Sequence, residues 1–141
     1  MKYKCLVLDH DDTVVDSSRT IHYPAFLDTL KQLRPNLNPL SFDEFNHHCF
    51  VYGFHHLCEV RYGFDKHEMM REYEIWKNHT QRKQAPAFDG WKALLHQFKA
   101  QGGIIIVVSY SESKEILRDY QDHFNLIPDR IYGYDAGPEN I

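Results

Sequence analysis

The sequence predicts an α/β fold, with a parallel β-sheet at its core and an α-helical insertion. Two short aliphatic runs support the sheet, Cys5–Leu8 and Ile104–Val108. Runs that are apolar at every position are typical of strands buried on both faces, as in a parallel sheet. The long stretch between them reads as several helices, although a crossover between parallel strands needs only one. The surplus helices therefore predict an inserted unit.

The helices are predicted from apolar residues that recur at helical spacing, and two of them from their first turns. Ser41 with Glu44, and Asp65 with Glu68, have the spacing of capping boxes. A short third strand is expected at Ile131-Tyr132. The apolar stripes are Phe26-Leu30-Leu33, Phe42-Phe45-Cys49-Tyr52, Met69-Tyr73-Trp76, Trp91-Leu94-Leu95-Phe98 and Ile116-Leu117-Tyr120-Phe124.

Composition narrows the class of protein. The chain has 141 residues, 43% of them hydrophobic, which fits one globular domain with an insertion. The net charge of −4 argues against a nucleic-acid-binding face, which needs a basic surface. No stretch approaches the roughly 20 apolar residues that span a membrane. The three cysteines show no disulfide or zinc-site spacing, so we expect a protein of the reducing cytoplasm. From the charge and the lack of a long apolar stretch, we expect that it binds no nucleic acid and no membrane.

Chemistry concentrates directly after the first predicted strand. Asp9, Asp11 and Thr13 are spaced two apart, so in an extended segment they point to one side. One carboxylate can attack an electrophile while the other protonates a leaving oxygen and later deprotonates water. The simpler interpretation of such an acidic cluster is a solvated turn or a helix N-cap. The buried-type strand before it, and a second strand that ends in Ser109, favour the functional interpretation.

An anionic phosphate would be repelled by two carboxylates unless a cation lies between them. Mg²⁺ accepts carboxylate and phosphate oxygens together, so we expect Mg²⁺ as the cofactor, with Asp9 and Asp11 as its ligands. The Ser109 hydroxyl is expected to bind a phosphate oxygen. Backbone N–H groups of Asp11, Asp12 and Tyr110 are expected to supply further donors.

At these residues the sequence resembles the haloacid dehalogenase superfamily, specifically its phosphatases with a C1-type cap, such as phosphoglycolate phosphatase and β-phosphoglucomutase-like proteins. The segment LVLDHDDTVVDS resembles the first motif and IIIVVS the second, while DRIYGYDAG resembles a later stretch. The resemblance implies a Rossmann-like core at 1–16 and 86–141, with a helical cap at 17–85. It also implies that Asp9 forms an aspartyl-phosphate, and that Asp11 is the general acid/base and binds Mg²⁺ through its backbone carbonyl. By the same resemblance, Ser109 binds the phosphate and Thr13 holds the loop.

The sequence departs from the family pattern at several points. Asp12 stands where the family usually has Gly, and Tyr110 replaces a common Asn. The family's catalytic Lys and its later acidic metal ligands are not found. Lys114 is a weak substitute, more simply interpreted as an exposed lysine at the start of a helix. We therefore expect the 141 residues to be a shortened version of such a phosphatase, whose open sheet edge at Cys5–Leu8 could self-associate or pair with another chain.

The function favoured by the sequence is Mg²⁺-dependent hydrolysis of a small phosphorylated metabolite through an aspartyl-phosphate. One alternative is a phosphomutase, in which a second substrate hydroxyl replaces water. Another is a catalytically incompetent fragment that binds phosphate or a partner protein. The histidine pairs His47-His48 and His55-His56 are interpreted first as surface or structural residues, then as substrate contacts, and last as a metal site.

Overall fold

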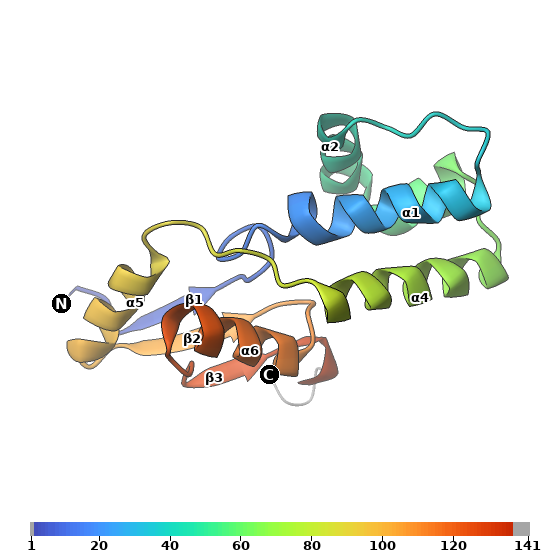
Figure 1. The fold of residues 1–141 in the computed structure, drawn as a ribbon. Coiled ribbons are helices and arrows are strands. Elements are labelled where there is room, and N and C mark those ends of the chain that lie inside the picture. The colour runs from blue at the N-terminus through green and yellow to red at the C-terminus, as the bar shows by residue number, and fades with distance from the viewer. Residues whose placement is uncertain (1, 137–141) are drawn as a thin grey trace. The chain divides into compact units, whose positions relative to one another are not determined.

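The computed structural model describes residues 2–136, which form two compact units (Figure 1). The first unit draws on the segments Met1–Asp16 and Ala85–Ile141, and the second is Ser17–Gln84. Residues 137–141 of the predicted core lie outside the described residues. The second unit consists of helices and connecting loops, and its role as a cap stays a prediction.

A parallel sheet of three strands forms the centre of the first unit. Its strands are β1 (Cys5–Leu8), β2 (Ile104–Val108) and β3 (Arg130–Tyr132), in the order β1-β2-β3. Both neighbouring pairs are parallel, with Leu6 opposite Ile105. The predicted α/β class and parallel sheet are therefore confirmed. Among the described residues β1 is an edge strand, as expected.

The two faces of this sheet differ in burial. Ile105 and Val107 are fully buried on the face against which the helices α5 (Trp91–Ala100) and α6 (Ser113–Phe124) pack. On the other face Val7 is 65% exposed. The expectation that the strands are buried on both faces is therefore wrong for the described residues. Its physical reason is that α5 and α6 contact each other and lie on one side of the sheet.

The buried face joins the sheet to the helices through large apolar side chains. Tyr120 and Phe124 of α6 meet edge to face, with ring centroids 5.3 Å apart. Helix α6 ends at Asn125, which adopts the left-handed conformation typical of a helix C-terminus. A short 3₁₀ helix, η3 (Tyr134–Ala136), follows β3. The buried core of this unit includes Leu95, Ile105, Val107, Ile116, Tyr120 and Phe124.

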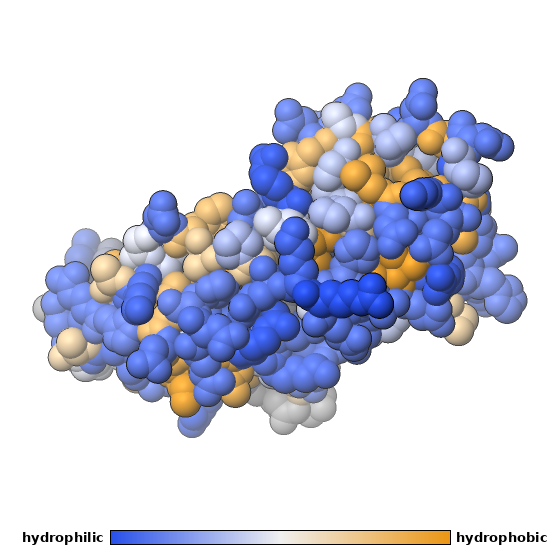
Figure 2. Space-filling view, viewed as in Figure 1, coloured by the Kyte–Doolittle hydropathy of each residue, from blue (hydrophilic) through white to orange (hydrophobic). Residues whose placement is uncertain are grey.

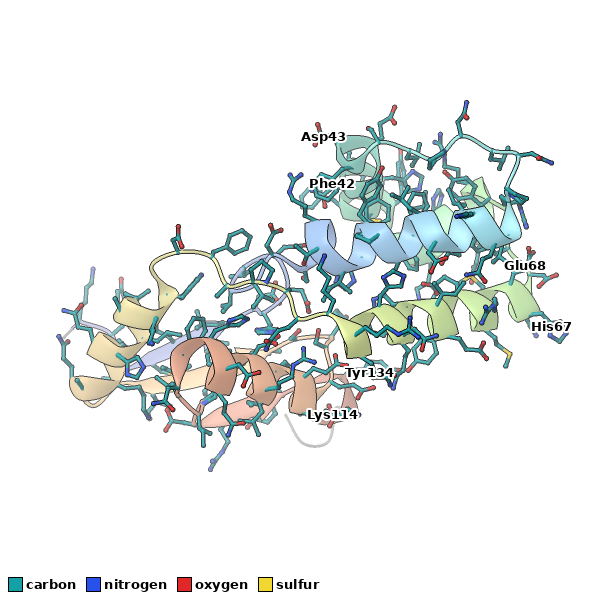
Figure 3. The ribbon with its side chains drawn as sticks, viewed as in Figure 1. Phe42, Asp43, His67, Glu68, Lys114 and Tyr134 are labelled. Atoms are coloured by element: carbon teal, nitrogen blue, oxygen red, sulfur yellow. The ribbon has the colours of Figure 1, made fainter. Side chains whose placement is uncertain are left out.

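Two helices of the second unit start where the sequence predicted. Both capping boxes are present: Ser41 and Glu44 exchange backbone and side-chain hydrogen bonds, as do Asp65 and Glu68. Figure 3 labels Glu68 in the first turn of its helix. The elements are η1 (Ser18–His22), α1 (Tyr23–Leu33), α2 (Phe42–Tyr52), α3 (Phe54–His56), η2 (Leu57–Arg61) and α4 (Lys66–Arg82).

An aromatic and aliphatic cluster forms the core of the second unit. The rings of Phe26 and Phe45 lie 4.8 Å apart, which joins α1 to α2. Helix α4 differs from the predicted stripe, since Tyr73 is exposed and Glu72 and Ile75 are buried. Figure 2 shows hydrophobic residues reaching the surface among hydrophilic ones. Among the residues that the structure describes, no helix is long and apolar enough to cross a membrane.

Candidate active site

The polar ends of β1 and β2 meet at the same edge of the sheet. Asp9 follows β1 directly and Ser109 follows β2, and these strands are parallel neighbours. The Ser109 hydroxyl donates to Oδ2 of Asp11 at 3.2 Å. The structure therefore brings together two of the predicted site residues that are far apart in the sequence.

A second hydroxyl at this edge was not predicted. The Ser111 Oγ donates to the same Oδ2 atom of Asp11 at 2.5 Å. The Ser111 backbone N–H in turn donates to Ser109 Oγ at 3.1 Å. The spacing of Ser109 and Ser111 matches that of Asp9 and Asp11, and this was the signal available in the sequence.

The Asp9 carboxylate is held by groups of its own loop. Its Oδ1 accepts a hydrogen bond from the backbone N–H of His10 at 2.8 Å. Its Oδ2 accepts one from the Thr13 hydroxyl at 3.3 Å. Asp9 is exposed. Its carboxylate is therefore open to solvent, although the two hydrogen bonds fix its orientation. Thr13 thus lies where a residue that holds the loop is needed.

The turn between the two aspartates has an unusual backbone. Asp12 has φ +60°, the left-handed region that most residues avoid. Gly, the residue that the resemblance leads us to expect here, adopts this conformation without a steric penalty. The Asp12 N–H donates to the Val15 carbonyl oxygen at 2.8 Å. That N–H is therefore engaged within the turn, whereas the sequence predicted it as a donor to phosphate.

His10 and Asp119 form a buried contact beneath this turn that the sequence did not indicate. His10 is only 1% exposed, and its Nε2 lies 2.8 Å from Asp119 Oδ2 on α6. The His10 ring also stacks on Tyr120, with centroids 5.9 Å apart. A histidine inside the string DHDD reads as a loop residue, and nothing local shows that its partner comes from a helix far along the chain.

The loop is also fastened to the segment where the chain returns to the first unit. The Trp91 indole N–H donates to the Thr13 carbonyl oxygen at 3.0 Å. The backbone N–H of Phe88 donates to the Val14 carbonyl oxygen, also at 3.0 Å. Trp91 was predicted only as an apolar core residue, so this second role of its ring was missed.

The exposed positions of Tyr110 and Lys114 do not test their predicted roles in phosphate binding. Tyr110 directly follows Ser109 and is 93% exposed. Lys114 lies in the first turn of α6, where Figure 3 labels it. Its Nζ is 3.4 Å from Glu112 Oε2, and its side chain is 74% exposed. This environment is that of a surface lysine paired with a neighbouring carboxylate.

The segment after β3 is hydrogen-bonded to the start of α6 and to the loop that carries Ser111. Asp135 accepts hydrogen bonds from the Ser113 backbone N–H at 2.8 Å and from the Ser113 hydroxyl at 2.9 Å. These bonds hold the pKa of the Asp135 carboxyl below its ordinary value. The Tyr134 N–H donates to the Ser111 carbonyl oxygen at 2.9 Å, so this segment also supports the serine that contacts Asp11.

The donor set suits a hard cation that keeps part of its water shell. The Asp9 carboxylate and the Asp11 backbone carbonyl supply oxygen ligands on one loop, the ligand type that Mg²⁺ prefers. Within residues 2–136, no group of three or more His, Cys, Asp or Glu side chains could hold a metal ion. Mg²⁺ is commonly bound through one or two carboxylates plus substrate phosphate and water, so one carboxylate with a neighbouring carbonyl oxygen fits it.

The histidines of the second unit do not form such a group. His48 Nε2 lies 3.0 Å from His56 Nδ1, and both rings pack near Tyr52. Burial and the nearby charge of His56 lower the pKa of His48. The two imidazoles thus contact each other directly, as a structural pair on the surface of this unit would.

Comparisons with known proteins find the same fold in several solved structures. No family model and no curated protein matches the sequence. Among solved structures, a protein from Bacteroides fragilis described as a haloacid dehalogenase-like hydrolase is similar, with a TM-score of 0.75 and 21% identity over 99% of this chain. A predicted phosphoglycolate phosphatase from Haemophilus somnus gives 0.70 and 16% over 98%, and a protein from Clostridium difficile described as a phosphatase gives 0.70 and 18% over 94%. The chain spans 61–65% of the length of these three structures.

Proposed function

We propose that this chain, whose fold is that of the haloacid dehalogenase-like hydrolases, is a phosphatase that hydrolyses small phosphate monoesters with Mg²⁺. The observation that carries the proposal is the meeting of Asp9, Asp11 and Ser109 at one sheet edge, with Ser109 hydrogen-bonded to Asp11. A carboxylate pair and a hydroxyl at the ends of adjacent parallel strands can receive a phosphoryl group.

In the first step an oxygen of the Asp9 carboxylate attacks the phosphorus atom in line with the ester oxygen. The bond between phosphorus and the ester oxygen breaks as the bond to Asp9 forms. Asp11 gives its proton to the departing oxygen, so the product leaves as an alcohol. The hydrogen bonds from His10 N–H and Thr13 favour Asp9 as the nucleophile, since they fix its carboxylate within the loop.

In the second step water attacks the phosphorus of the aspartyl-phosphate. Asp11, now ionised, takes a proton from that water, and the bond between phosphorus and Asp9 breaks to release inorganic phosphate. The hydroxyls of Ser109 and Ser111 both contact Oδ2 of Asp11, so they orient the group that moves the proton. Because the Ser109 hydroxyl has one proton, its predicted bond to a phosphate oxygen would replace its bond to Asp11, which Ser111 continues to contact.

Mg²⁺, held by the Asp9 carboxylate and the Asp11 backbone carbonyl, would supply positive charge against the phosphate oxygens, which is a large contribution in phosphoryl transfer. The Asp11 carboxyl group then stays available to transfer the proton. The substrate class is a small phosphorylated metabolite. Support for it comes from the phosphatase descriptions of the similar structures, one of which names a phosphoglycolate phosphatase.

The test is turnover of p-nitrophenyl phosphate with Mg²⁺, together with calorimetric binding of inorganic phosphate in the presence and absence of Mg²⁺. We expect Asp9→Asn to reduce turnover by at least about a thousandfold, because the amide is a poor nucleophile. Asp122→Asn is the matched control, since Asp122 is an exposed carboxylate on α6 of the same unit. It is expected to retain turnover within about twofold.

Two results would contradict the proposal. Turnover that survives Asp9→Asn would rule out Asp9 as the nucleophile. A wild-type chain with neither Mg²⁺-dependent turnover nor Mg²⁺-dependent phosphate binding would rule out the site as a whole.

A further inference from the structure

We propose that His10 is a positioning residue, which together with Asp119 fixes the loop that carries Asp9 and Asp11 against helix α6. The catalytic consequence of this role rests on the proposed phosphatase function. The positioning itself can be tested without any reaction.

The contact has the burial and geometry of an anchor. Both side chains are nearly inaccessible, with 2% and 7% of the His10 and Asp119 side chains exposed. The His10 Nε2 lies 2.8 Å from Asp119 Oδ2, and because a carboxylate only accepts, Nε2 carries the proton and donates. Arg118 donates to the other oxygen of the same carboxylate, through Nη2 at 3.1 Å. Asp119 is thereby held from two sides.

His10 is placed where fixing one residue fixes the whole turn. It lies between Asp9 and Asp11 in the sequence, and its N–H donates to Asp9. Its carbonyl oxygen accepts from the N–H groups of Thr13, Val14 and Val15, at 3.3, 2.9 and 3.3 Å. Movement of His10 would therefore move both the Asp9 carboxylate and the turn that leads to Thr13.

Simple packing does not account for a histidine at this position. The His10 Nδ1 is buried and has no hydrogen-bond partner among the described residues. A buried polar atom without a partner costs free energy, which an apolar side chain of similar size would avoid. Such an apolar side chain could also pack against the Tyr120 ring, as His10 does. Only a side chain with a hydrogen-bond donor at the position of Nε2 can make the contact with Asp119.

The test compares two substitutions of similar volume. His10→Gln places an amide N–H near the position of Nε2 and keeps the donor to Asp119, whereas His10→Leu fills the space without it. Amide hydrogen exchange is followed at Val14 and Val15, with Ile105 and Val107 of β2 as internal controls. We expect exchange at Val14 and Val15 to accelerate at least about tenfold in His10→Leu but stay near the wild-type rate in His10→Gln, with the β2 amides unchanged in both.

Turnover of p-nitrophenyl phosphate gives the second readout. We expect kcat to fall about 10- to 100-fold in His10→Leu, with KM changed less than about threefold, because the nucleophile is displaced while the phosphate donors remain. His10→Gln is expected to restore most of kcat. If His10→Leu does not fold, Asp119→Ala takes its place and Asp119→Asn becomes its conservative partner.

The outcomes separate this inference from the proposed function. Equal exchange at Val14 and Val15 in the Gln and Leu variants overturns the positioning role, whatever the activity. Acceleration of the β2 amides to the same degree also overturns it, because His10 would then stabilise the whole unit. A chain without turnover but with the expected exchange pattern supports the anchor and contradicts only the phosphatase proposal.

Discussion

At the scale of single residues, Asp12 shows how the loop accepts a backbone that its sequence does not favour. Its φ of +60° is the left-handed conformation, which an L-residue other than Gly, Asn or Asp adopts at a cost. Aspartate tolerates it through local hydrogen bonds of its short side chain. The departure from the usual Gly was visible in the sequence, but its conformational meaning became visible only with the dihedral angle.

We predict that Asp12→Ala destabilises the chain relative to Asp12→Gly by about 1 kcal/mol, because alanine has a Cβ and no polar group to offset the left-handed backbone. Urea denaturation of the two variants measures the difference. Alanine at least as stable as glycine would show that this turn relaxes to another backbone conformation.

At the scale of elements, the sequence predicted what is decided locally. The three strands and both capping boxes depend on neighbouring residues, and they are confirmed. The predicted face of α4 was wrong, since Tyr73 is exposed and Glu72 is buried. Which face of a helix is buried depends on packing partners elsewhere in the chain. A sequence pattern assigns a glutamate such as Glu72 to the exposed face, because its side chain is charged.

The loops after β2 and β3 are packed so closely that a methyl group does not fit between them. A Cβ at Gly133 would lie 2.6 Å from the Ser111 carbonyl oxygen and 2.7 Å from the Ser113 nitrogen, both backbone atoms. We predict that Gly133→Ala lowers the free energy of unfolding by about 1–3 kcal/mol, as other overpacked positions do. Urea denaturation measures it. An unchanged midpoint would mean that the two loops can separate without loss.

At the scale of the whole molecule, the site depends on contacts between distant segments. The loop at Asp9 was predicted from its own residues. The contacts of Ser111 with Asp11, and of His10 with Asp119, join positions about 100 residues apart in the chain. Because β1 and β2 are parallel neighbours, the residues that follow them, Asp9 and Ser109, are expected to lie close together. No such rule links His10 to a particular residue of α6, so that part of the site required the structure.

The stability of the whole chain is predicted to depend on the protonation of Glu72 in the second unit. Burial raises the pKa of Glu72 from 4.5 to about 7, partly offset by His22. Between these values the folded chain keeps a proton that the unfolded chain releases, so stability falls as pH rises from 4.5 toward 7 and then stays level. Glu72→Gln removes this loss, and we expect it to be more stable than wild type at pH 8 by on the order of 2 kcal/mol.

Urea denaturation at pH 5 and pH 8 checks this dependence on Glu72. Glu74→Gln is the matched control, because Glu74 lies on the same helix and is exposed. The control is expected to follow the wild-type pH profile. A Glu72→Gln variant whose advantage over wild type is the same at both pH values would show that Glu72 stays ionised in the folded chain.

The chain leaves the first unit and returns to it at nearly the same point. The Asp16 N–H donates to the Pro86 carbonyl oxygen at 2.9 Å, and Val15 pairs with Ala87 in an antiparallel bridge. The first unit therefore closes on itself locally, and the whole helical segment is one excursion from a joined stem. Excursions of this kind tolerate insertion and exchange well. Because both ends of the helical segment are fixed at this stem, its length and composition can change without displacing the end of the aspartate loop.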